Sequence, residues 1–120
     1  MTVKHTSITL ITVLILTSCL KEKAEPNLGN LVCSSTSFIN DVMPILNNYS
    51  CTSGSCHSSS AASNGVVLDT HAGVTNVNTA RLLGSIEQSQ GYKSMPLSGK
   101  LTASEINTIK CWIKDGKQNN

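Results

Sequence analysis

The stretch Cys51-Thr52-Ser53-Gly54-Ser55-Cys56-His57 places two thiols and an imidazole close together in the chain. Two cysteines followed at once by a histidine are typical of covalent haem attachment, for which the common spacing has two residues between the cysteines. This chain has four, Thr52 to Ser55, and three of them are small enough for the extra length to bulge outward. The stretch therefore predicts thioether bonds from Cys51 and Cys56, with His57 as an iron ligand.

Three other interpretations of the same residues are open. Cys51 and Cys56 can form a local disulfide, with His57 only a polar neighbour. They can bind zinc, but a structural zinc site has four protein ligands, and outside the remaining cysteines only His71 is available in the mature domain. They can also be unreacted thiols, which is unusual outside the cytoplasm.

The N-terminal residues predict export. Lys4 and His5 precede the apolar run Ile8–Leu16, which is long enough for a secretory signal and too short to span a bilayer. The run ends in Leu16-Thr-Ser-Cys19, which resembles a bacterial lipobox, so we expect residues 1–18 to be a lipoprotein signal peptide and Cys19 to be lipidated. The alternatives are an ordinary signal peptide or an uncleaved anchor. The prediction is an exported protein, lipid-anchored to a bacterial membrane and facing the periplasm or the cell exterior.

Composition divides the rest of the chain in two. Residues 19–32 are mostly polar, with mixed charges, and predict a flexible tether; residues 33–120 form the domain. After loss of Lys4 with the signal, eight Lys and Arg remain against seven Asp and Glu, a balance that argues against a nucleic-acid partner. Aromatic residues are scarce, so a large apolar cofactor would supply much of the core that so small a domain lacks.

Helical patterns dominate this domain, and no strand pattern is comparably strong. The first predicted helix begins after a possible N-cap at Ser37, and Pro44 should bend it or mark where its regular part begins. Its apolar face is made of residues at helical spacing, namely Phe38, Ile39, Val42, Ile45, Leu46 and Tyr49. Residues 57–65 are small and polar, without periodicity, and predict a loop.

Three more helices follow in the sequence. Asp69 is expected to cap a short helix from Thr70 to about Val74, and a second short helix runs from Thr79 to about Glu87. The last helix begins with the capping box Thr102-Ala-Ser-Glu105 and ends near Gly116. Its buried face contains Ile106, Ile109 and Ile113, flanked by Trp112. The predicted fold is mostly α.

A second axial ligand for the iron would come from Met43, His71 or Met95. Met95 lies in a loop before the last helix, where Pro96 would hold the thioether in place. Met43 falls on the apolar side of the first helix, and a methionine there more commonly fills the core.

From about Ser37 to its end, the chain resembles the monohaem c-type cytochromes that occur in bacterial lipoproteins and in respiratory or oxidative assemblies. The matching elements, in chain order, are Asp41-Val-Met-Pro-Ile-Leu leading into the cysteines, Gly65-Val-Val-Leu-Asp69, Met95-Pro96, and Leu101-Thr102 through Glu105-Ile106 to Trp112-Ile113 and Gly116. The wider cysteine spacing recurs in some members. Many members have a second proline after the methionine, where this chain has Leu97.

The resemblance implies a small cytochrome c-like domain with long loops around one covalent haem c. Cys51 and Cys56 would be the thioether residues, His57 the proximal ligand and Met95 the distal one. With both axial positions filled, the implied function is one-electron transfer with redox partner proteins, as a carrier or a haem subunit of a larger complex, and not catalysis. Two alternatives are a haem-free interaction lipoprotein stapled by disulfides, and a gas sensor in which Met95 leaves the iron.

Two cysteines have no part in the motif. Cys111 lies roughly opposite the apolar face of the last helix, and Cys33 stands just before the first helix. In the cytochrome c fold the first and last helices pack against each other, which implies a Cys33–Cys111 disulfide in an oxidising compartment.

Overall fold

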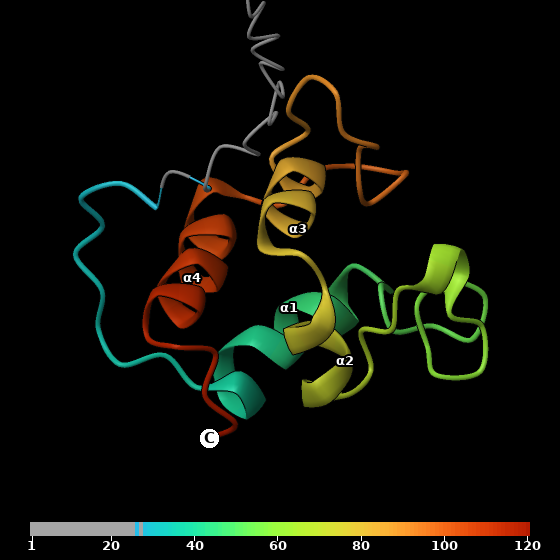
Figure 1. Ribbon diagram of the computed structural model, residues 1–120, viewed down its shortest axis with the longest axis horizontal. Helices are drawn as coiled ribbons and strands as arrows, with labels where there is room; N and C mark the ends of the chain where they lie inside the picture. Colours follow the sequence, from blue (N-terminus) through green and yellow to red (C-terminus); the bar gives the residue numbers. More distant parts are fainter. Residues whose placement is uncertain (1–25, 27) are drawn as a thin grey trace, which may run out of the picture.

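The domain is built from short helices joined by long loops, as the sequence predicted (Figure 1). The computed structural model describes residue 26 and residues 28–120. The predicted signal peptide, the lipidation site Cys19 and most of the predicted tether lie outside the described residues. Within the described part there is no strand, and the elements are η1 (Phe38–Val42), α1 (Met43–Asn48), η2 (Ser63–Gly65), α2 (His71–Asn76), α3 (Thr79–Ile86) and α4 (Ala103–Lys114).

The first predicted helix is present, but its first turn is a π-helix. The Ser37 hydroxyl caps it by accepting from the Asn40 amide at 3.1 Å. Pro44 lacks an amide proton, and regular α-helix begins only at the residue before it, Met43. The wide turn changes which residues face inward, so the predicted burial of Ile39 was wrong: its side chain is 61% exposed, while Phe38 and Val42 are buried.

The two short helices occur where they were predicted, with one change of cap. The hydroxyl of Thr70 accepts from the Gly73 amide at 3.1 Å and caps α2, so the prediction of Asp69 as the cap was wrong. The Asp69 carboxylate bonds to Ser59 instead. Helix α3 is capped by Asn78, whose side-chain oxygen accepts from the Arg81 amide at 3.0 Å.

Helix α4 has both of the ends that its sequence predicted. Thr102 and Glu105 form the reciprocal capping box at its start. At its end Gly116 adopts a left-handed φ of 88°, and the Lys117 amide donates to the Trp112 carbonyl at 2.9 Å. This arrangement is a Schellman motif, in which glycine avoids the steric cost of a left-handed residue.

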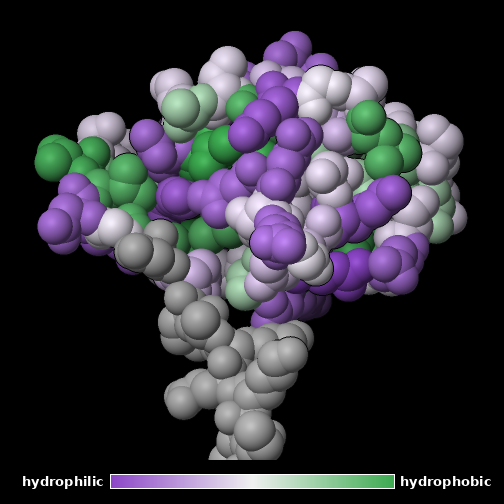
Figure 2. Space-filling model, turned by 90° about the horizontal axis from the view of Figure 1, so that it is seen from above, coloured by the Kyte–Doolittle hydropathy of each residue, from purple (hydrophilic) through white to green (hydrophobic). Residues whose placement is uncertain are grey.

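The core lies between α4, η1–α1 and α3. Trp112 is fully buried at its centre, with its indole N–H donating to the Gln118 carbonyl at 2.9 Å. The buried apolar cluster comprises Phe38, Val42, Leu46, Leu68, Val74, Leu82, Leu83, Ile86, Leu101, Ile106, Ile109 and Trp112. On the face shown in Figure 2, apolar residues form separate patches among polar ones.

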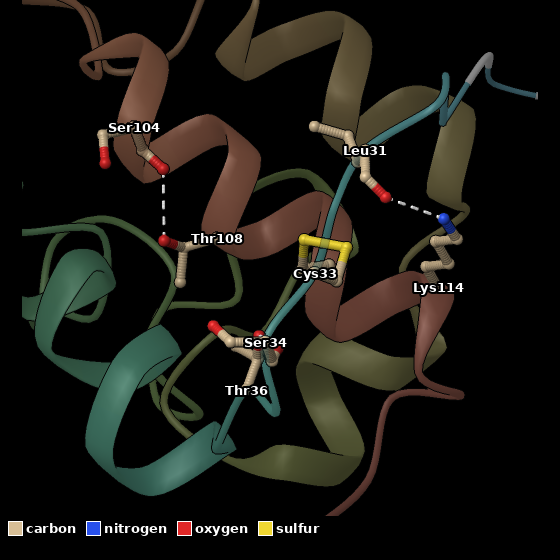
Figure 3. Close-up of a disulfide and its surroundings, with 8 residues drawn as sticks. Leu31, Cys33, Ser34, Thr36, Ser104, Thr108 and Lys114 are labelled. Atoms are coloured by element: carbon tan, nitrogen blue, oxygen red, sulfur yellow. Dashed lines mark hydrogen bonds between the residues drawn. A yellow bond between two sulfur atoms is a disulfide. The ribbon is translucent and has the colours of Figure 1, made fainter.

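A disulfide joins Cys33 to Cys111, as the resemblance implied, with 5.5 Å between their Cα atoms. It holds residues 28–36, the covering segment, against α4, and the Lys114 ammonium donates to the Leu31 carbonyl at 3.0 Å (Figure 3). Cys111 faces away from the main cluster, but the covering segment leaves it only 7% exposed. The last residues of the predicted tether therefore touch the domain, since Leu28 also packs against the core.

Among the helices that the structure describes, none has the length and apolar composition needed to cross a membrane.

Candidate functional site

The end of α1 sets the position of Cys51. Ser50 adopts a left-handed φ of 56°, which turns the chain back over the helix. The Cys51 amide then donates to the Leu46 carbonyl at 2.9 Å and the Ser50 amide to the Asn47 carbonyl at 2.9 Å. These two bonds form a Schellman motif with serine in the place that usually holds glycine. The first thiol of the motif is thereby attached to a helix end and does not depend on a free loop.

The residues between the two cysteines fold into consecutive turns. The Ser53 amide donates to the Ser50 carbonyl at 3.2 Å, and the Cys56 amide to the Ser53 carbonyl at 3.0 Å. The His57 amide returns to the Cys51 carbonyl at 3.0 Å, which closes the run on itself. The four intervening residues are accommodated within this closed turn, and the first cysteine is bonded through its backbone to the histidine.

Both motif thiols are unpaired in the structure. Burial raises the pKa of the Cys51 thiol, and the nearby Cys56 adds to the rise because a second thiolate would repel the first. In this structure no disulfide joins Cys51 to Cys56.

His57 is held in one orientation by the backbone. Its Nδ1 lies 3.2 Å from the carbonyl oxygen of Val66, which can only accept, so Nδ1 carries the proton and donates it. The neutral ring then has its lone pair on Nε2, and Nε2 has no hydrogen-bond partner among the described residues. A carbonyl that accepts from one ring nitrogen orients a histidine to bind a metal through the other nitrogen.

Residues 57–69 form a closed loop that supports the His57 side chain. The Leu68 amide donates to the His57 carbonyl at 2.7 Å, so the two ends of residues 57–69 lie side by side. Asp69 then accepts from the amide and the hydroxyl of Ser59, both at 2.6 Å. The loop is compact, with its ends bonded to each other, and it carries the Val66 carbonyl to the imidazole.

The structure separates the three residues considered as a second iron ligand. His71 belongs to the core: its ring lies 4.8 Å from that of Phe38, edge to face, and its Nε2 is 2.8 Å from the Lys117 carbonyl. Met43 is partly buried and packs against the core cluster. Met95 differs from both, since it lies half-buried in the loop between α3 and α4. Of the three, Met95 alone lies in a loop outside the core packing.

The Met95 loop is tied to α3 at two places. The Met95 amide donates to the Ser85 carbonyl at 3.0 Å. The Tyr92 ring lies against Gly84, so closely that a side chain at this glycine would overlap it. Beyond Met95, the Leu97 side chain is 78% exposed. In Figure 1 this orange loop extends above and to the right of α3, whereas the green loop that follows Cys51 extends to the right of α1 and α2.

The described residues include the donor types that covalent haem attachment uses. Two thiols are unpaired, the adjacent imidazole has an unoccupied Nε2, and a thioether is available from a second loop. For the zinc alternative, no three His, Cys, Asp or Glu side chains among the described residues come together in positions to hold one ion.

Two supporting groups could not be identified from the sequence. The Val66 carbonyl is a backbone atom, which every residue has, so no residue type marks it. Ser50 is an ordinary serine whose φ of 56° follows from the closing of α1. The run Asn47-Asn48-Tyr49-Ser50 did indicate that a helix ends there.

Comparisons of the chain with protein-family models, with curated proteins and with solved structures give no match.

Proposed function

We propose that this protein is a c-type cytochrome that transfers single electrons, with one haem joined to Cys51 and Cys56. His57 serves as the proximal iron ligand and Met95 as the distal one. The observation that carries the proposal is the imidazole of His57, whose Nδ1 is engaged by the Val66 carbonyl while Nε2 has no partner among the described residues, and which directly follows Cys56 in the chain. Bound haem would supply an iron that alternates between two oxidation states.

The chain's own residues have three tasks in this proposal. The end of α1 presents the Cys51 thiol, and the closed turn brings Cys56 and His57 after it. The Val66 carbonyl keeps the His57 ring in the tautomer that offers Nε2. The Met95 thioether would be the second residue to hold the iron, and a His and Met pair favours the reduced state over two histidines.

We further propose that the domain is exported and held at a bacterial membrane through lipid on Cys19. Several acyl chains on one residue anchor strongly, whereas a single chain gives reversible binding. The partners in this proposal are redox proteins, and the protein is a carrier or a haem subunit, not an enzyme.

The test is haem staining after denaturing electrophoresis of protein made in a host that can mature c-type cytochromes. Only covalent haem survives that treatment. The proposal predicts a stained band for the wild-type chain and none for the Cys51→Ser/Cys56→Ser variant. Cys33→Ser/Cys111→Ser is the matched control, which removes the same number of cysteines and should keep the stain.

The alternatives predict other results in the same preparation. A colourless protein with a disulfide between Cys51 and Cys56 would overturn the haem proposal in favour of the disulfide-stapled lipoprotein. Mass spectrometry of the peptides that contain these cysteines detects the bond as a loss of two hydrogen atoms relative to the reduced form. Carbon monoxide binding to the reduced, coloured protein would replace the carrier with a gas sensor.

A further inference from the structure

A hydrogen bond connects the cysteine motif to the start of the last helix. The Tyr49 hydroxyl donates to Oε2 of Glu105 at 2.8 Å, across a separation of 56 residues. Tyr49 is the C-cap of α1, and Glu105 is the third residue of α4. The bond therefore joins the C-terminal end of α1 to the N-terminal end of α4.

The acceptor end of this bond is well fixed. Oε2 of Glu105 also accepts from the amide and the hydroxyl of Thr102, each at 2.8 Å. The Glu105 amide donates back to the Thr102 hydroxyl at 3.2 Å. Three donors therefore converge on one carboxylate oxygen, and the helix start holds that oxygen in place.

The donor end leads directly to the motif. Tyr49 precedes the left-handed Ser50, and the next residue is Cys51, whose amide is bonded to Leu46. The carbonyl of Cys51 accepts from the His57 amide at 3.0 Å. A displacement of the α1 end would therefore move Cys51 and, through its carbonyl, the backbone of His57.

We propose that Tyr49 and Glu105 are positioning residues that hold the Cys51–His57 turn in a fixed relation to α4. The inference rests on the proposed function, which gives the reason for fixing this turn. A turn that carries both attachment thiols and an iron ligand requires a constant position. Tyr49 needs no contact with the haem for this role. It acts through the backbone of Cys51.

Amide hydrogen exchange of the full mature chain, followed residue by residue, tests the role. Removing the hydroxyl with Tyr49→Phe should speed exchange at Cys51, Cys56 and His57 roughly two- to tenfold, the effect of losing one hydrogen bond. The slowest amides of α3 and α4 should keep their wild-type rates. Tyr92→Phe is the matched control and should change none of these rates, because the Tyr92 hydroxyl has no partner among the described residues.

Substitution of the acceptor gives an independent readout. Glu105→Gln keeps an oxygen that can accept from Tyr49 and from the cap, so its exchange at the turn should stay within about twofold of wild type, whereas Glu105→Ala should match or exceed Tyr49→Phe. Wild-type exchange at the turn in Tyr49→Phe would overturn the proposal. So would acceleration by one common factor at the turn and in α4, because that result indicates a role in global stability alone.

The haem proposal and this inference fail in different ways. A wild-type protein without covalent haem contradicts the proposed function, and the exchange comparison on that same protein still decides the role of Tyr49. A haem-stained Tyr49→Phe protein with unchanged exchange contradicts only the positioning role.

Discussion

Asp69 accepts two hydrogen bonds from Ser59, one from its amide and one from its hydroxyl, both at 2.6 Å. With the Leu68 to His57 bond, this contact closes the loop that carries the Val66 carbonyl to His57. The carboxylate is therefore part of the support for the candidate iron ligand.

The contact predicts a pH dependence of stability. The two bonds from Ser59 lower the pKa of the Asp69 carboxyl below its ordinary value. Because the folded pKa is the lower one, the stabilisation is fully present well above the unfolded pKa of about 3.9 and is lost as the pH falls through the folded pKa. In urea unfolding, Asp69→Asn should be less stable than wild type at pH 7, and the gap should close at acid pH. A gap of equal size at every pH would contradict the prediction.

Ser50→Gly should stabilise the protein. Ser50 has a left-handed φ of 56° at the C-terminal end of α1, a conformation that costs a non-glycine residue about 1 kcal/mol or more. Glycine removes that cost but gives the unfolded chain more freedom, so the net gain should be about 0.5 kcal/mol in the free energy of unfolding. Chemical denaturation measures it. Ser53→Gly, at a position without positive φ, is the control and should not stabilise.

Loss of the Cys33–Cys111 disulfide should cost more than any other change proposed for this domain. The bond closes a loop with a sequence separation of 78, for which the entropic model gives about 4 kcal/mol. Cys33→Ser/Cys111→Ser should lower the free energy of unfolding by about 2 to 5 kcal/mol. Thiol counting on the unfolded, unreduced wild-type protein is the direct check, and reaction at Cys33 and Cys111 would disprove the bond.

Met95→Ala should keep the covalent haem but change the iron. The near-infrared absorption band from the sulfur to iron bond should disappear, and the reduction potential should fall because a thioether ligand favours the reduced state. Met43→Leu is the control, since Met43 packs against the core, and its spectrum should match wild type. An unchanged spectrum in Met95→Ala would remove Met95 from the ligand role.

Gly84→Ala should destabilise the Met95 loop. A side chain at Gly84 would overlap the Tyr92 ring, and relief requires displacement of that ring or of α3, at a cost of about 1 to 3 kcal/mol. Gly54→Ala has open space around the new methyl group and should be nearly neutral in thermal unfolding. The double variant Gly84→Ala/Tyr92→Ala should regain part of the loss, and failure to do so would place the clash elsewhere.

Local signals in the sequence were reliable where a few neighbouring residues suffice. The capping box of Thr102 and Glu105, the cap at Ser37 and the start of regular helix around Pro44 all depend on backbone groups within a turn, and the structure has each of them. Predictions that assumed an unbroken helical period were weaker. Ile39 is exposed because the π-turn of η1 widens the spiral before α1 begins.

In the candidate site, too, the sequence determined some features and the tertiary structure the others. Cys51, Cys56 and His57 fall within one run of seven residues, so the sequence by itself determined that a single short segment carries two thiols and an imidazole. Only the tertiary structure decided that Val66 turns the imidazole, that Asp69 bonds Ser59 and not α2, and that Tyr49 reaches Glu105. These contacts join residues brought near by loop closure and core packing, which pairs of residues far apart in the sequence do not reveal, and the Val66 carbonyl is a backbone group that every residue has.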